Sequence, residues 1–199
     1  KRQILDINMG CPVPKVVNNG EGSALLKNPN LIEEIVRKVS SAISKPLTVK
    51  VRIGFENEPV DIVEIAKRIE DAGAAALAVH GRTRQQYYSG TADWDTIRRV
   101  KEAITIPVIG NGDVDSPLKA EALVKQTGCD AVMVGRAVRG NPWLFRELNH
   151  YFRTGELLER PSVEEIREMI LRHARKQIEL KGEFVAVSYT HLTLPTILR

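Results

Sequence analysis

The sequence is poor in cysteine, in aromatic residues and in long apolar stretches. Only two cysteines occur in 199 residues, Cys11 and Cys129, and no Cys-x-x-Cys pair is present. We therefore expect neither a disulfide framework nor a zinc ribbon, and we expect the protein to reside in a reducing compartment. No apolar run approaches the roughly 18 residues that a membrane-spanning helix needs. The first residues show no signal-peptide pattern, so we expect a cytoplasmic chain without membrane contact.

The composition is otherwise that of an ordinary globular protein. Hydrophobic residues make up 43% of the chain and charged residues 27%, which is enough apolar material for a sizeable core. The formal net charge is +4 at pH 7. A basic balance of this size is compatible with an acidic partner such as RNA but does not by itself indicate one.

Five short, apolar, β-branched runs alternate with amphipathic helical patterns along the chain. The expected strands cover residues 3–8, 47–53, 76–81, 107–112 and 131–136. Helical spacing of apolar residues follows each of them, and the last such helix is expected over 141–152. Nearly continuous apolar strands are typical of a parallel sheet that is covered on both faces. The pattern therefore predicts an α/β fold with a parallel sheet.

The ends of the expected strands separate two α/β architectures. An open doubly wound sheet gathers its ligand groups at one switch point, whereas a (β/α)8 TIM barrel delivers every strand end to the same mouth. All five strands here end in polar residues, glycine or cysteine, which favours the barrel. A barrel has eight strands, so we expect the C-terminal five βα units of a barrel that lacks three N-terminal units. The alternative is an unusually incomplete sheet.

The expected domain organisation has three parts. Residues 1–155 would form the partial barrel, strands four to eight. A longer helix is expected from about residue 161, because Ser162 and Glu165 have the spacing of a capping box. Residues 161–187 would then begin a helical domain. The threonine-rich stretch 188–199 lacks helical periodicity, and we expect it to be a non-native or disordered tail.

Two glycine-containing strand ends predict a phosphate site. Phosphate sites in barrels form from the loops after the last two strands, where glycine lets backbone N–H groups approach an anion. "NGD" at 111–113 and "GR" at 135–136 are such ends. Arg136 adds a charge of fixed geometry. The alternative is that Gly112 and Gly135 only make tight turns.

Cations occur in pairs on two of the expected strands. Lys50 and Arg52 are two residues apart, as are His80 and Arg82, so each pair points to one face of its strand. At the mouth of a barrel, these side chains would hold negative charge. The stretch from Arg84 to Tyr88 follows as a loop of cationic, polar and aromatic residues, a composition that suits single-stranded RNA but also an ordinary solvated loop.

Cys11 lies in "DINMGCPVPK", directly beyond an expected strand. A free thiol is mostly protonated at neutral pH and is able to act as a general acid. A nucleophilic cysteine would need a paired base, and the motif has no neighbouring histidine. Cys129 precedes the last strand, at the stability face of a barrel, and we expect it to be structural.

Five motifs together resemble a known family. "DINMGCPVPKVVNNGEGSALL", "VKVRIGF", "VHGRTRQQYYSGTADW", "PVIGNGDV" and "VMVGRAVRGNPWLF" are similar to the flavin-dependent tRNA-dihydrouridine synthases, in particular those of the bacterial B-type. The resemblance covers residues 1 to about 187. It implies a (β/α)8 barrel whose first three units are absent here, followed by a helical tRNA-binding domain. It also implies FMN, with NADPH as electron donor, and reduction of specific uridines in tRNA to dihydrouridine.

The resemblance also implies roles for individual residues. Cys11 would be the catalytic proton donor. The expected cofactor contacts are Lys50, His80, Asn111, Gly112, Asp113, Gly135 and Arg136. The expected contacts to the uridine and its tRNA are Asn8, Arg52, Arg82 and Arg84.

Two other hypotheses remain open from the sequence. One is an FMN barrel reductase of a free pyrimidine, similar to dihydroorotate dehydrogenase. The other is a flavin-free fragment that keeps RNA affinity through its basic surface. Because five parallel strands leave open sheet edges, we also expect the isolated chain to self-associate.

Overall fold

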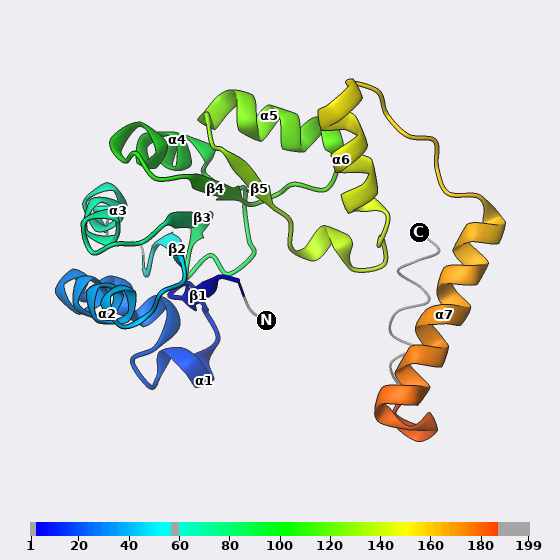
Figure 1. Cartoon of the computed structure of the whole chain (residues 1–199), viewed down its shortest axis with the longest axis horizontal. Coiled ribbons are helices and arrows are strands. Elements are labelled where there is room, and N and C mark those ends of the chain that lie inside the picture. Colours follow the sequence, from blue (N-terminus) through cyan, green and yellow to red (C-terminus); the bar gives the residue numbers. More distant parts are fainter. Residues whose placement is uncertain (1–2, 57–59, 187–199) are drawn as a thin grey trace. The chain divides into compact units, whose positions relative to one another are not determined.

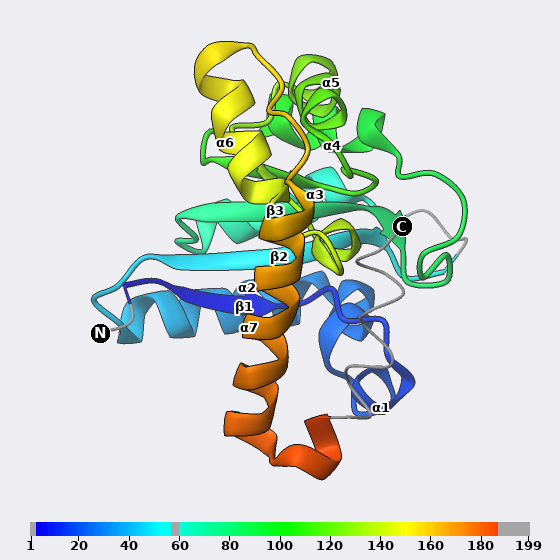
Figure 2. The ribbon, with the colours of Figure 1, turned by 90° about the vertical axis from the view of Figure 1, so that its right-hand side faces the viewer.

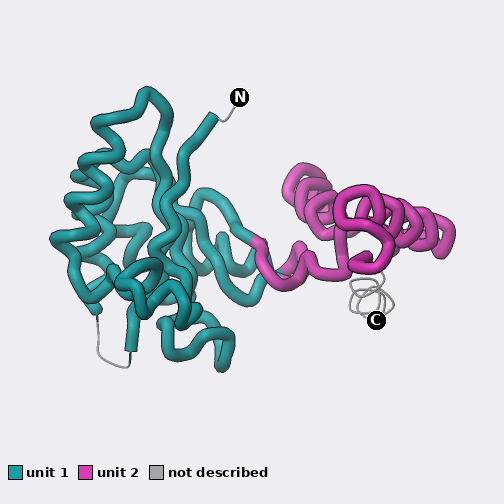
Figure 3. The backbone as a smooth tube through the Cα atoms, turned by 90° about the horizontal axis from the view of Figure 1, so that it is seen from below, with its two compact units in different colours: residues 1–114, 119–133 teal, residues 115–118, 134–199 magenta. Residues whose placement is uncertain are grey.

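The computed structural model describes residues 3–56 and 60–186, so the expected tail, 188–199, lies outside the described residues. The chain forms two compact units (Figure 3). The first comprises residues 1–114 and 119–133, and the second residues 115–118 and 134–199. The division between the compact units falls near residue 134. The expected domain boundaries, at 155 and 161, are not tested by this division and stay predictions.

The first unit is built on a five-stranded parallel sheet. Its strands are β1 (Leu5–Asn8), β2 (Leu47–Gly54), β3 (Ala76–Thr83), β4 (Val108–Asn111) and β5 (Ala131–Met133). They lie side by side in sequence order, and every neighbouring pair is parallel. Figure 2 shows β1, β2 and β3 next to one another. An in-order parallel sheet is the arrangement of consecutive units of a (β/α)8 barrel. The predicted α/β class is confirmed.

Helices cover one face of this sheet. In Figure 1, α2 (Pro29–Ala42), α3 (Ile62–Asp71) and α4 (Trp94–Ala103) lie along its outer side, and α5 (Pro117–Thr127) follows β4. The side chains of Asn28, Asp61 and Asp93 cap the first three by accepting backbone N–H groups. Short helical turns, α1 (Pro14–Val17) and η1 (Gly22–Lys27), connect β1 to α2.

The core lies between the helices and the outer face of the sheet. Strand residues that point outward are fully buried, among them Val49, Leu77 and Val108, each 0% exposed. They pack with the apolar stripes of the helices, to which Ile32 and Ile97 belong. Fully burying a side chain of this size contributes about 1.5–3 kcal/mol, so this layer supplies much of the driving force for folding.

The inner face of the sheet is polar instead. Side chains alternate along a strand, so the neighbours of the buried valines point inward. The register places Asn8 beside Lys50, and Arg52 beside His80, which in turn lies beside Asn111. Among the described strands, β1 and β5 each pair along one edge only.

The second unit is helical. It contains η2 (Arg136–Val138), α6 (Leu144–Thr154) and α7 (Val163–Lys181). Helix α6 ends at Gly155, whose left-handed φ of 76° suits glycine. Helix α7 begins with the predicted capping box between Ser162 and Glu165, which is confirmed. No helix among residues 3–56 and 60–186 is long and apolar enough to cross a bilayer.

Candidate active site

The structure brings most of the predicted site residues to one edge of the first unit. Asn8, Lys50, Arg52, His80 and Asn111 occupy neighbouring register positions near the carboxyl ends of four adjacent strands. Cys11 follows β1 in the next loop, and Arg82 and Arg84 continue from β3. Gly135 and Arg136 follow β5 and belong to the second unit, where both are exposed.

Arg52 is a buried link between two loops. Its side chain is 2% exposed, although it carries a charge. Its Nε donates to the carbonyl of Gly10 at 3.0 Å, and its Nη1 donates to the carbonyls of Thr83 and Tyr87, each at 2.9 Å. The guanidinium thus joins the loop that carries Cys11 to the loop after β3. The predicted substrate contact of Arg52 stays a prediction.

Arg82 and Asp113 form a second buried link. Arg82 is 1% exposed, and its two Nη atoms lie 2.7 and 2.8 Å from the two carboxylate oxygens of Asp113. Arg82 also donates to the carbonyls of Ser89 and Gly90, while Asp113 accepts the N–H of Ala92 at 2.7 Å. One charge-assisted hydrogen bond, from Nη2, and a close ion pair at Nη1 join the two side chains. The pair fixes the loop after β3 to the end of β4.

Gly112 is required by the packing of the protein itself. Its φ is 135°, and a Cβ at this position would lie 2.5 Å from the Cβ of Ala92 and 3.4 Å from the ring of His80. Its carbonyl accepts the indole N–H of Trp94 at 3.1 Å. By contrast, a Cβ at Gly135 would meet no atom within 4 Å, which leaves open space there. The expected phosphate contacts of both glycines stay predictions.

The inner face concentrates positive charge. Burial, reinforced by the neighbouring Arg52, lowers the pKa of Lys50 to about 8. Burial also lowers the pKa of His80 to about 3, helped by Arg52, Lys50 and Arg82 and opposed by Asp113. His80 is therefore neutral at physiological pH and available as a hydrogen-bonding imidazole. A partly buried cluster in which cations lower each other's pKa favours a bound anion.

The turn after β1 holds Cys11. The side chain of Cys11 is half-buried, and Cys129 is buried, as predicted for a structural cysteine. Asn8 Oδ1 accepts the N–H of Gly10 at 3.0 Å. The carbonyl of Cys11 accepts both the N–H and the hydroxyl of Ser23, at 3.0 and 2.9 Å. Ser23 was missed by the sequence reasoning, because its only signal is the glycine that precedes it.

The loop after β3 presents exposed aromatic rings. Tyr87 and Tyr88 are each 42% exposed and meet edge to face, with ring centroids 4.9 Å apart. Arg84 lies over the ring of Phe55, 5.3 Å from its centroid, and Lys27 lies 4.0 Å from the same centroid. The predicted combination of cations and aromatics is therefore present. Its contact with RNA stays a prediction.

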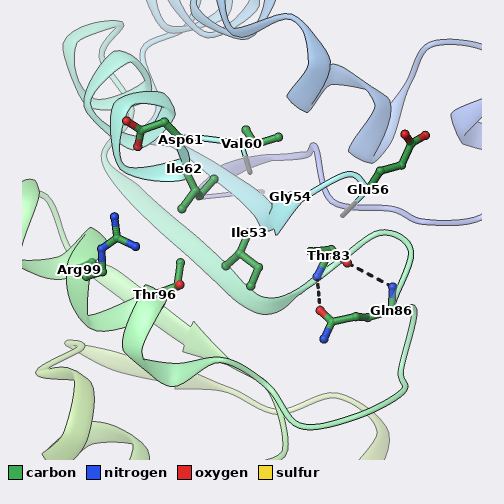
Figure 4. A pocket seen from close by; sticks show the side chains of 10 residues that line it. All are labelled: Ile53, Gly54, Glu56, Val60, Asp61, Ile62, Thr83, Gln86, Thr96 and Arg99. Atoms are coloured by element: carbon green, nitrogen blue, oxygen red, sulfur yellow. Dashed lines mark hydrogen bonds between the residues drawn. The ribbon is translucent and has the colours of Figure 1, made fainter. Parts of the chain in front are cut away.

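A cavity of about 610 Å³ lies elsewhere, between the N-terminal parts of α3 and α4 (Figure 4). Thr83 and Gln86, which exchange two hydrogen bonds, form one of its walls. The residues that line it are Ile53, Gly54, Glu56, Val60, Asp61, Ile62, Thr83, Gln86, Thr96 and Arg99. None of the predicted site residues is among them. Because side chains from two outer helices line it, this cavity is not the candidate active site.

Comparisons with known proteins agree with this arrangement. The family model of dihydrouridine synthase matches residues 1–193. The tRNA-dihydrouridine synthase B of Shewanella oneidensis is 47% identical over 186 residues, which cover 94% of this chain and 58% of that protein. That of Pseudomonas putida is 46% identical over 185 residues, which cover 93% of this chain and 55% of that protein. The chain spans little more than half the length of these curated relatives. Over that length, it belongs to the dihydrouridine synthase family.

Proposed function

We propose that the protein to which this chain belongs reduces uridines in tRNA to 5,6-dihydrouridine, with FMN as cofactor and NADPH as electron donor. The observation that carries this proposal is the cluster of Lys50, Arg52 and Arg82 on the inner face. Asp6 near Lys50 and Asp113 beside Arg82 offset only part of its positive charge. Such a cluster fits an anionic cofactor. The relatives that this chain matches are named tRNA-dihydrouridine synthase B, and we expect the same cluster in them.

The residues of the inner face fit the proposed cofactor. Bound FMN, after its reduction by NADPH, would supply hydride to C6 of the uracil ring. Lys50, which is cationic below its pKa of about 8, would hold negative charge that develops beside it. His80, being neutral, would donate or accept a hydrogen bond without adding charge. Gly135 and Arg136 are proposed to contact the FMN phosphate, and Asn111, Gly112 and Asp113 are each proposed as further contacts of the cofactor.

The remaining residues would handle the uracil. Asn8 Oδ1 is occupied by the N–H of Gly10, so Asn8 would donate from Nδ2 to a uracil carbonyl. Cys11 would give its thiol proton to C5, which completes the addition across the C5–C6 bond. A uridine reaches such a mouth only when it leaves its stack, and the exposed Tyr87 and Tyr88 offer rings on which nearby bases can stack. A tRNA substrate would fit the cytoplasmic location expected from the sequence.

The test uses the full-length protein. After purification, a flavin spectrum would support the cofactor assignment, and a colourless protein that takes up no FMN would contradict it. The protein is then incubated with NADPH and tRNA from cells that lack dihydrouridine. Mass spectrometry of the digested tRNA should show uridine converted to dihydrouridine. Reduction of free uracil or orotate, with untouched tRNA, would instead favour a reductase of free pyrimidines.

A further inference from the structure

We infer that Ser23 and Arg52 are positioning residues that hold the backbone on both sides of Cys11 and so place its thiol. The inference rests on the proposed function only because the proposed function makes the Cys11 thiol the proton donor. It concerns two consecutive carbonyl groups, those of Gly10 and Cys11, and the buried side chains that bind them. We call Ser23 and Arg52 together the Cys11 clamp.

Ser23 binds the carbonyl of Cys11 twice. Its side chain is 0% exposed, and both its N–H and its hydroxyl donate to this one oxygen, at 3.0 and 2.9 Å. A buried hydroxyl that loses its partner is costly, so the serine and the carbonyl constrain each other. Because Ser23 is the second residue of η1, the position of Cys11 is tied to that helical turn.

Gly22 allows this close approach. Its φ is 59°, and a Cβ there would lie 2.8 Å from the carbonyl oxygen of Cys11 and 3.0 Å from the Cβ of Cys11. Any larger residue would push η1 away from the turn. The backbone of η1 is therefore pressed directly against Cys11, and Ser23 is the hydrogen-bonding part of that contact.

Arg52 binds the preceding carbonyl from the side of the sheet. Its Nε donates to Gly10 at 3.0 Å, and three of its five N–H groups are used for backbone carbonyls. Two of those carbonyls, of Thr83 and Tyr87, belong to the loop after β3. Lysine has no planar fork and is not able to reproduce three such contacts at once. Arg52 therefore acts by geometry as well as by charge.

The clamp matters because proton transfer depends on placement. A general acid must lie within hydrogen-bond reach of the carbon or oxygen that it protonates, and a misplacement of about 1 Å typically costs about 100-fold in rate. Cys11 has no side-chain hydrogen bond of its own among the described contacts. The thiol is therefore fixed through the hydrogen bonds to the backbone carbonyls of Gly10 and Cys11.

The test compares Ser23→Ala and Arg52→Lys with wild type in the full-length protein. Thr127→Val is the matched control, because Thr127 is 2% exposed and its hydroxyl also donates to a backbone carbonyl, that of Leu123 at 2.8 Å, beside Cys129 rather than Cys11. The first measurement is the rate at which iodoacetamide alkylates Cys11, read by mass spectrometry. The second is oxidation of the reduced protein over a range of tRNA concentrations, which gives the limiting single-turnover rate and, under turnover with NADPH, the KM for tRNA.

Both clamp variants should alkylate at Cys11 several-fold faster than wild type and should oxidise about 10- to 100-fold more slowly, with the KM for tRNA nearly unchanged. Thr127→Val should match wild type in both measurements, whatever it loses in Tm. Wild-type alkylation and oxidation rates in Ser23→Ala would overturn the inference for Ser23. For Arg52→Lys, a raised KM with unchanged alkylation would make Arg52 a substrate contact instead.

The clamp can be tested even if one variant does not fold or the proposed function is wrong. If Ser23→Ala does not fold, Arg52→Lys still tests the clamp by the same measurements. If the wild-type protein forms no dihydrouridine, the proposed function fails, but the alkylation rates still show whether Ser23 and Arg52 hold Cys11. Unchanged alkylation in every folded variant would then overturn the clamp as well.

Discussion

The same strands form both faces of the five-stranded sheet, but one face packs in the apolar core and the other carries the candidate active site. The outer face, with Val49, Leu77 and Val108, is fully buried under helices. The inner face carries Lys50, Arg52 and His80 at alternating positions of β2 and β3. Arg52 is buried as well, but its side chain binds backbone carbonyls instead of packing in the apolar layer. Alternate residues of one strand therefore serve two purposes: one set packs in the core, and the other set forms the candidate active site. Substitutions on each face test this division.

The largest effect is expected at the mouth. In the full-length protein, Cys11→Ala should lose about 100- to 10,000-fold in uridine reduction, because a positioned general acid is removed. FMN content and the rate of flavin reduction by NADPH should stay close to wild type. Single-turnover oxidation by tRNA measures the loss. If the variant oxidises as fast as wild type, Cys11 is not the proton donor.

The next effect concerns the outer face and should leave the chemistry intact. Leu77→Ala should lower the free energy of unfolding by about 2–5 kcal/mol, because it opens a cavity in a fully packed layer. Leu31→Ala, at a position that is 38% exposed, is the control and should cost much less. Urea unfolding of both full-length variants measures the difference. Equal losses would show that burial in the outer layer does not decide stability.

A smaller effect is expected in the loop after β5, where the cofactor phosphate is proposed to bind. Arg136→Ala should weaken FMN binding by about 1.5–3 kcal/mol, since a hydrogen bond to a charged group is lost. Riboflavin, which has no phosphate, should bind equally well to both proteins. Arg139→Ala, three residues further and also exposed, serves as the control. Equal losses for FMN and riboflavin would remove Arg136 from the phosphate site.

The smallest effect is a pH dependence that comes from the inner face. His80 has a pKa of about 3 in the folded protein, below the ordinary value of 6.5. As the pH falls below 6.5, the unfolded chain binds a proton that the folded protein does not, so stability falls. Between about pH 7 and about pH 5 this contribution amounts to up to about 2 kcal/mol. Urea unfolding at both pH values should show a smaller difference in His80→Gln than in wild type; identical differences would contradict the assignment.

Sequence reasoning located the strands but not all of their ends. The run 131–136 was expected to be one strand, whereas β5 stops at Met133, where the second unit begins. The strand expected over 107–112 stops at Asn111, because Gly112 has a φ of 135° that no strand continues. The helix expected over 141–152 begins at Leu144, since Pro142 disfavours helical geometry in the residue before it. Apolar periodicity thus predicts where elements form better than where they stop.

The candidate site was predicted in its membership but not in its connections. That Lys50, His80 and Asn111 share one edge follows from parity and strand order alone. That Arg82 pairs with Asp113 does not, because the partners are 31 residues apart and several other acidic residues lie nearer in the chain. The same holds for Arg52 and the Gly10 carbonyl, 42 residues apart. A backbone carbonyl leaves no trace in the sequence, so such contacts emerge only when the loops are placed.

Helix α7 has a consequence for how the chain opens. It runs for 19 residues, and none of them is buried. A helix without a buried stripe depends on its caps and on local ion pairs such as that between Lys176 and Glu179, and these give only tenths of a kcal/mol each. Its backbone amides should therefore exchange with deuterated solvent long before those of β2 and β3. Among the described residues, α7 would therefore open before the sheet does.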